Sequence, residues 1–136
     1  MVGGFRFSRH FTVAEAEALL PTVRGWLAEL AREAAEVRRL RGMVQESGPD
    51  PRLEEAIEER KAWMAALIGR FEEEGIELKG LEPALVDFPA LMQGVEVYLC
   101  WREPEERVGH WHPLSTGYAG RRPIAEEGVP MFEWCN

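Results

Sequence analysis

Two stretches of the chain carry apolar residues at spacings of three, four and seven, the pattern of a helix packed against another helix. In residues 22–45, where only Arg41 interrupts the series, these positions are Val23, Leu27, Leu30, Ala34, Val37 and Val44. In residues 51–74 they are Leu53, Ile57, Met64, Leu67 and Phe71. Between the stretches lies Ser-Gly-Pro-Asp-Pro, which is rich in turn formers. We therefore predict an antiparallel helical hairpin in which Leu30 and Leu67 are buried.

The chain before this hairpin contains a helix start and a helix breaker. Residues 12–15, Thr-Val-Ala-Glu, have the composition of a capping box, so a helix is predicted to begin there. Pro21 follows, and a proline inside a helix removes a hydrogen bond and clashes with the preceding turn. We expect either a short first helix that ends near Leu20 or a kink, with Pro21 opening the long helix. Aromatic and polar residues alternate in residues 5–8, which indicates an edge strand or an ordered tail.

After Gly75 six prolines arrive at short intervals and exclude another long helix. Residues 95–101 alternate strictly and are rich in β-branched and aromatic side chains, so they are predicted to form a strand. Residues 108–112 form a second strand in a β-hairpin, and residues 85–88 are a candidate third strand. The predicted fold class is α+β: a long antiparallel helical hairpin, then a small antiparallel β-hairpin or sheet, then an irregular C-terminal tail.

Length and composition fit one domain, residues 1–136, with a helical segment 1–75 and a β-rich segment 76–136 that holds the candidate site. The net charge of -8 argues against a nucleic-acid partner. No apolar run approaches the roughly 20 residues that span a bilayer, and the N-terminus lacks an export signal, so we expect no membrane partner and a cytoplasmic location. Two apolar helix seams and five Trp exceed what so small a fold covers easily, which predicts a homodimer.

The histidines of the second predicted strand are candidate metal ligands. His110 and His112 are two residues apart, so on a strand they point to the same face. We predict that they bind one divalent metal ion, with Glu96 as the third ligand. Asp87 and Glu103 are alternative third ligands or general bases.

The register between the two strands decides what these histidines face. In one register Cys100 is opposite His110 and Tyr98 is opposite His112, which makes a polar cluster. In a register shifted by one residue, both histidines face the apolar side of the first strand. Cys100 itself is expected to be a buried packing residue, because the sequence around it lacks an oxyanion-hole signature of a cysteine enzyme.

A second set of residues is predicted to bind a ligand: Asp87, His112, Tyr118, Arg121 and Arg122. Asp87 lies between apolar neighbours, where an unpaired carboxylate is costly, and the arginines follow a Gly-X-X-Gly turn that can fold back over the sheet. We expect Asp87, His112 and one of the arginines to converge on a pocket suited to a small anion or one divalent ion. Two alternatives stay open: Asp87 is a turn or cap residue, or these side chains satisfy one another without a ligand.

Four segments occur in order along the second half of the chain: Val86-Asp87-Phe88-Pro89, Leu99-Cys100-Trp101, Trp111-His112 and Gly117-Tyr118-Ala119-Gly120-Arg121-Arg122-Pro123. This order resembles that of an uncharacterised prokaryotic family, the domain of unknown function twenty-two-oh-three. The resemblance extends from Phe11 to Ile124. In that family an acidic residue often follows the Trp-His pair, where this chain has Pro113, and a glycine often stands at the position of Ala84. If the acidic residue orients the histidine or binds a metal, its absence weakens the metal hypothesis. The resemblance implies no known activity.

Three functional hypotheses follow. The leading one is a non-catalytic module that binds a small ligand or another protein through a polar pocket in residues 85–123, since the chain shows no complete triad, phosphate loop or cofactor motif. The second is a metal-dependent enzyme that uses His110 and His112 with a nearby carboxylate. The third is a purely structural helical subunit completed by a partner.

Overall fold

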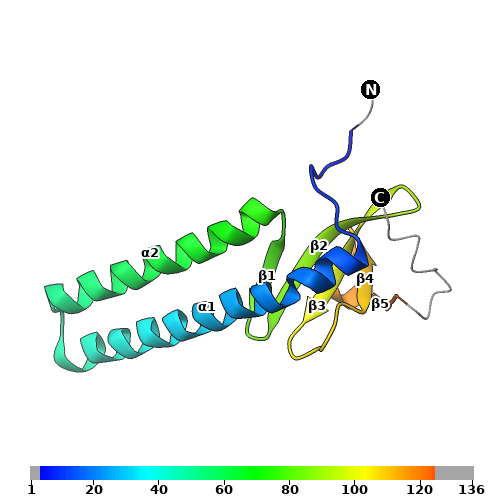
Figure 1. The fold of residues 1–136 in the computed structure, drawn as a ribbon. Helices are drawn as coiled ribbons and strands as arrows, with labels where there is room; N and C mark the ends of the chain where they lie inside the picture. Colours follow the sequence, from blue (N-terminus) through cyan, green and yellow to red (C-terminus); the bar gives the residue numbers. More distant parts are fainter. Residues whose placement is uncertain (1–3, 125–136) are drawn as a thin grey trace.

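The structure, a computed structural model, describes residues 4–124 of the 136-residue chain. Two long helices come first and a five-stranded antiparallel sheet follows, which confirms the predicted α+β class (Figure 1). The elements are α1 (Val13–Ser47), α2 (Pro51–Glu74), β1 (Glu77–Leu81), β2 (Ala84–Met92), β3 (Val95–Arg102), β4 (His110–Pro113), the 3-10 turn η1 (Tyr118–Gly120) and β5 (Arg122–Pro123). None of the helices described is long and apolar enough to cross a bilayer.

Helix α1 runs without interruption through Pro21, so the expected end near Leu20 was wrong. The helix does begin at the predicted capping box, in which Thr12 Oγ1 accepts from the Glu15 amide at 3.0 Å and Glu15 Oε1 accepts from the Thr12 amide at 2.8 Å. Pro21 lies on the exposed side of the helix, where water can satisfy the backbone carbonyl that the proline leaves without a donor. Leu20 and Val23 are buried beside it and hold this part of the helix in the core.

The predicted hairpin of helices is confirmed. Asp50 caps α2, Pro51 occupies its first turn, and Gly75 ends it in the left-handed conformation at φ 81°. Leu30 and Leu67 are both 0% exposed. Beyond them the hairpin projects away from the sheet (Figure 1), and Val37, Leu40 and Ile57 form a separate small core there.

The five strands pair in chain order, β1-β2-β3-β4-β5, each antiparallel to the next. The two strands of the predicted β-hairpin are β3 and β4, and residues 85–88 lie in β2, at the centre of the β1–β2–β3 half of the sheet. Gln93 and Gly94 join β2 to β3 with φ angles of 53° and 81°, the pair of positive values that a tight two-residue hairpin turn uses. Strand β1 was not predicted. Residues 5–8 form no strand and correspond to the ordered tail.

Each strand presents its alternate residues to opposite faces of the sheet. On one face Val86, Phe88 and Leu99 belong to the main hydrophobic core, which includes Leu27 and other residues of α1. The other face is polar, yet Asp87 is only 3% exposed. The sheet therefore separates an ordinary core from a second, polar interior. The part of the predicted irregular C-terminal tail beyond residue 124 lies outside the described residues.

Candidate functional site

The register of three neighbouring strands assembles the polar face. Cys100 of β3 is paired with Asp87 of β2 on one side and with His110 of β4 on the other. Tyr98 is paired with His112. Of the two registers left open by the sequence, the structure thus has the one that places both histidines on the polar face.

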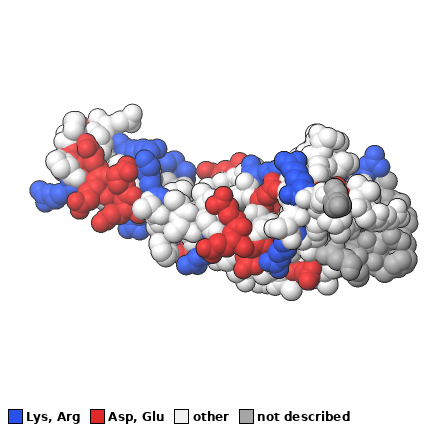
Figure 2. Space-filling view, turned by 90° about the horizontal axis from the view of Figure 1, so that it is seen from above, with Lys and Arg blue, Asp and Glu red and all other residues white. Residues whose placement is uncertain are grey.

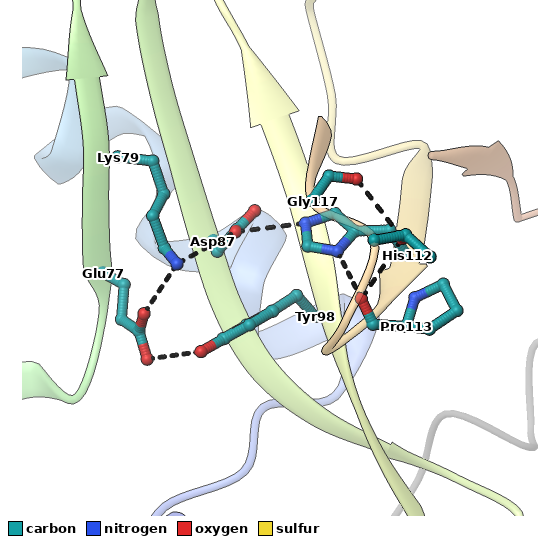
Figure 3. Close-up of polar contacts among 8 residues, drawn as sticks. Glu77, Lys79, Asp87, Tyr98, His112, Pro113 and Gly117 are labelled. Atoms are coloured by element: carbon teal, nitrogen blue, oxygen red, sulfur yellow. Dashed lines mark hydrogen bonds and ion pairs between the residues drawn. The ribbon is translucent and has the colours of Figure 1, made fainter. Parts of the chain in front are cut away.

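Asp87 and His112 form the centre of the site (Figure 3). His112 Nε2 lies 3.1 Å from Asp87 Oδ2, and His112 Nδ1 donates to the carbonyl oxygen of Pro113 at 2.8 Å. Burial alone would lower the pKa of His112, but the hydrogen bonds to Asp87 and Pro113 outweigh it, and the pKa is raised above its ordinary value. The ring therefore keeps its positive charge to a higher pH than a free histidine does.

Cys100 lies beside this ion pair. Its thiol is fully buried, and burial, reinforced by the negative charge of Asp87, raises its pKa to about 12. A neutral thiol is a poor nucleophile, so Cys100 does not form an activated Cys-His pair with His112. Residues 4–124 contain one group of three potential metal ligands, formed by Asp87, Cys100 and His112. One ligand atom of each lies within 4.8 Å of the other two.

The carboxylate of Asp87 is incompletely satisfied. Oδ2 accepts from His112 and lies 3.9 Å from Lys79 Nζ, whereas Oδ1 is buried without a hydrogen-bond partner in the described chain. Lys79 also pairs with Glu77 at 3.0 Å, and Glu77 accepts from the hydroxyl of Tyr98 at 2.7 Å (Figure 3). Burial and the neighbouring Glu77 raise the pKa of Tyr98. Sequence reasoning missed Glu77 and Lys79, although residues 77–79 alternate polar and apolar side chains as a short strand does.

A second polar cluster centres on Glu105, in the loop between β3 and β4. Its Oε2 forms an ion pair with Arg121 Nη2 and lies 3.5 Å from His110 Nδ1, and its Oε1 accepts from the Arg102 amide at 2.8 Å. His110 therefore pairs with Glu105 rather than joining His112 as a metal ligand. The sequence did not single out Glu105, because its place in a loop gave no pattern from which this contact could be inferred.

Glu96 is not part of the site. Its carboxylate accepts from the backbone amides of Arg6 and Phe7, both at 2.9 Å, and pairs with His10 Nε2 at 2.8 Å. Burial opposes ionisation of Glu96, but these hydrogen bonds outweigh it and hold its pKa below the ordinary value. The predicted metal set of His110, His112 and Glu96 is thus not brought together. The physical reason is that β4 ends opposite residue 97, so no β4 residue lies opposite Glu96.

The predicted ligand-binding residues divide into three groups. Asp87 and His112 are in direct contact. Arg121 lies in the neighbouring cluster, with Tyr118 at its rim, where the guanidinium is 4.9 Å from the centre of the phenol ring. Arg122 does not converge with them, because it is paired with Trp111 and its guanidinium lies 6.0 Å from that indole ring, on the core side of the sheet.

The family comparison covers all of these elements. A family model described as an uncharacterized conserved protein, DUF2203, matches residues 9–124. The chain belongs to this family. The resemblance found in the sequence is therefore confirmed, and both polar clusters lie inside the matched region. Searches of the curated proteins and of the solved structures found no match.

Proposed function

We propose that this DUF2203 protein is a small binding module whose ligand is one divalent metal ion, held by Asp87, Cys100 and His112. The observation that carries the proposal is the meeting of three different ligand types within 4.8 Å, in which Asp87 Oδ1 is buried and has no hydrogen-bond partner among residues 4–124. Buried polar atoms in proteins are nearly always hydrogen-bonded or bound to an ion, so an orphaned oxygen beside a thiol and an imidazole supports a cation site.

The donor set favours zinc. A thiolate, an imidazole and a carboxylate are common ligands of Zn²⁺, whereas Mg²⁺ and Ca²⁺ take oxygen ligands. Zinc-ligand bonds of about 2.0–2.3 Å place the ligands of a tetrahedral site about 3.4 Å apart, and His112 Nε2 is already 3.1 Å from Asp87 Oδ2. The hydrogen bond from His112 Nδ1 to Pro113 fixes the ring so that Nε2 faces the other two ligands, as metal-binding histidines require.

Charge balance also supports an exchange of protons for a metal ion. At a pH where His112 is protonated, the metal-free cluster holds a positive imidazolium, a neutral thiol and a negative carboxylate, so its net charge is zero. A divalent ion that displaces the two protons of His112 and Cys100 leaves a neutral imidazole, a thiolate and a carboxylate. The +2 charge of the ion balances the two negative groups, so the net charge is again zero. A buried site can make this exchange without the large cost of an uncompensated charge.

A titration of untagged, metal-free protein with Zn²⁺ or Co²⁺ tests the proposal. We expect one ion to bind, two protons to be released, and a thiolate-to-cobalt charge-transfer band to appear. Cys100→Ser and Asp87→Asn should each weaken binding at least tenfold, as loss of a ligand does. His110→Gln and Glu96→Gln are matched controls that should bind normally. Absence of binding in a folded wild-type protein, or full affinity in Cys100→Ser, would contradict the proposal.

A metal-dependent enzyme is the second candidate, favoured by the number of ligands. Three protein ligands leave a fourth position for water, as catalytic zinc sites do, whereas structural zinc sites have four. Azide added to the cobalt-loaded protein should change its visible spectrum if this position is open. An unchanged spectrum would leave only the binding module. Either role needs a reduced Cys100, in keeping with a cytoplasmic location, which we also propose.

A further inference from the structure

Within residues 4–124, the buried guanidinium of Arg121 has one N–H donor without a hydrogen-bond partner. Its side chain is 10% exposed, its Nη2 donates to Glu105, and its Nε is buried with no hydrogen-bond partner in the described residues. A guanidinium normally uses several of its five N–H groups when it is buried, because each unsatisfied donor is costly. The turn before Arg121 holds it in this position, since its amide donates to the carbonyl of Tyr118 at 3.1 Å.

A second guanidinium contacts the same aromatic ring as Arg121 does. The Arg121 and Arg102 guanidinium groups are 4.9 and 5.8 Å from the centre of the same Tyr118 ring. Within residues 4–124, Glu105 is the one carboxylate that an ion pair joins to Arg121, and it is shared with His110, so a single carboxylate faces the guanidinium and the imidazole. A guanidinium whose carboxylate partner is shared in this way favours a further negatively charged ligand.

We propose that Arg121, with Arg102 at the same Tyr118 ring, binds a small oxyanion, a phosphate or a carboxylate, next to the Asp87, Cys100 and His112 cluster. The planar fork of a guanidinium matches the oxygen spacing of both anions, and the free Nε supplies the first hydrogen bond. Glu105 occupies Nη2 and competes for the same cation. The anion site does not itself need a metal ion, but its coupling to the cluster rests on the proposed function.

Two observations link the anion site to the cluster. Cys100 is paired across the strands with His110, which contacts the same oxygen of Glu105 as Arg121 does. Arg121 is therefore joined to the cluster through Glu105, His110 and the strand pairing of Cys100. A metal ion bound by the cluster would add positive charge beside Arg121 and attract the anion. The two ligands should therefore bind cooperatively.

The experiment is calorimetric titration of inorganic phosphate, and separately of acetate, into metal-free and stoichiometrically zinc-loaded protein, with chloride at equal ionic strength as the reference. We expect at least one of the two anions to bind both forms and to bind the loaded form more tightly. Arg121→Lys should weaken binding at least tenfold, and Glu105→Gln should strengthen it. Arg122→Lys is the matched control, because that guanidinium lies on the other face of the sheet, and it should bind as the wild type does.

The outcomes separate this inference from the proposed function. Anion binding without any zinc binding supports the anion site and contradicts the metal proposal. No binding of either anion by either form, or equal affinity in wild type and folded Arg121→Lys, overturns the inference even if zinc binds. Binding of phosphate alone, or of both anions, supports the site and assigns its ligand class.

Discussion

The ion pair between Asp87 and His112 makes the stability of the metal-free protein depend on pH. The folded protein raises the pKa of His112 above its ordinary 6.5, so below that pH both folded and unfolded chains carry the proton and the stabilisation is complete. As the pH rises through the folded pKa, the ring loses its proton and the stabilisation is lost. The free energy of unfolding should therefore fall above about pH 6.5.

Urea denaturation between pH 6 and 9 measures this dependence. His112→Gln should flatten the fall, because the titrating ring is gone, whereas His110→Gln should preserve it. A free energy of unfolding that rises over the same range in the wild type would contradict the assignment. Bound zinc should reverse the trend, since metal binding is favoured as His112 and Cys100 lose their protons.

The Cys100 thiol should be unreactive in the folded protein. With a pKa of about 12, its thiolate fraction at neutral pH is roughly a thousandfold below that of a free cysteine. In a Cys135→Ser background, which removes the other thiol, a disulfide reagent should modify Cys100 at least about a thousandfold more slowly in native buffer than in urea. Equal rates in a folded protein would show that the thiol is exposed or activated.

Single residues show how far the sequence predicts the site. Alternation in residues 95–101 placed Cys100 and Tyr98 on one face, and the cost of an unpaired carboxylate predicted a partner for Asp87, which in the structure is His112. The register could not be derived, because the loop of residues 103–109 is irregular and two pairings fitted equally well. The structure does not bring Glu96 beside the histidines of β4, because that strand ends opposite residue 97 and nothing in the sequence showed how early it ends.

At the scale of elements, Pro21 removes one backbone hydrogen bond from α1, and a substitution can restore it. Pro21→Ala restores an amide that can donate to the carbonyl four residues earlier, and alanine has the highest helix propensity. The substitution should raise the free energy of unfolding, by up to about 3 kcal/mol. Pro51→Ala is the matched control, since Pro51 occupies a first-turn position that needs no amide, and it should change stability little. Chemical denaturation compares the two, and a destabilised Pro21→Ala protein would show that the proline favours the fold.

Leu30 tests the helical hairpin. It lies on α1 and is fully buried in the main hydrophobic core, so Leu30→Ala should lower the free energy of unfolding by about 2–5 kcal/mol. Met43→Ala, at a position that is 40% exposed, should change it by less than about 0.5 kcal/mol. Denaturant unfolding of both variants measures the difference, and similar small effects would refute the burial of Leu30.

The sequence predicted best the helices whose ends carry capping residues or a glycine in the left-handed conformation. Thr12, Asp50 and Gly75 mark helix ends through capping and the left-handed conformation, and apolar spacing identifies the helices between them. Pro21 misled the prediction because a proline is tolerated where the helix faces water. Strand β1 was missed because it is short and carries few β-branched or aromatic residues, so only pairing with β2 makes it a strand.

At the scale of the whole molecule, we expect a homodimer formed through the helical hairpin. Figure 2 shows acidic and basic side chains mixed along the hairpin with uncharged surface between them, a distribution that a second copy can complement. Trp63 and Ile68 on α2 are 42% and 40% exposed. Light scattering should give twice the chain mass, and Ile68→Glu should shift the protein toward monomer while Glu58→Gln should not. A monomer mass for the wild type at every concentration would exclude the dimer.

The pairing of each strand with the next one along the chain has a consequence for folding. Contacts in such a sheet are close in sequence, which favours rapid formation, and the tight turn at Gln93 and Gly94 is the natural point of nucleation. Asp87 and His112 come from strands on either side of β3, so they meet once three consecutive strands have paired. The step that brings together residues far apart in the sequence is the docking of the N-terminal part of the chain, where the Phe11 amide donates to the Pro89 carbonyl at 2.7 Å. If the proposed metal ion binds during refolding, it would stabilise the paired β2, β3 and β4 before the N-terminal part of the chain docks.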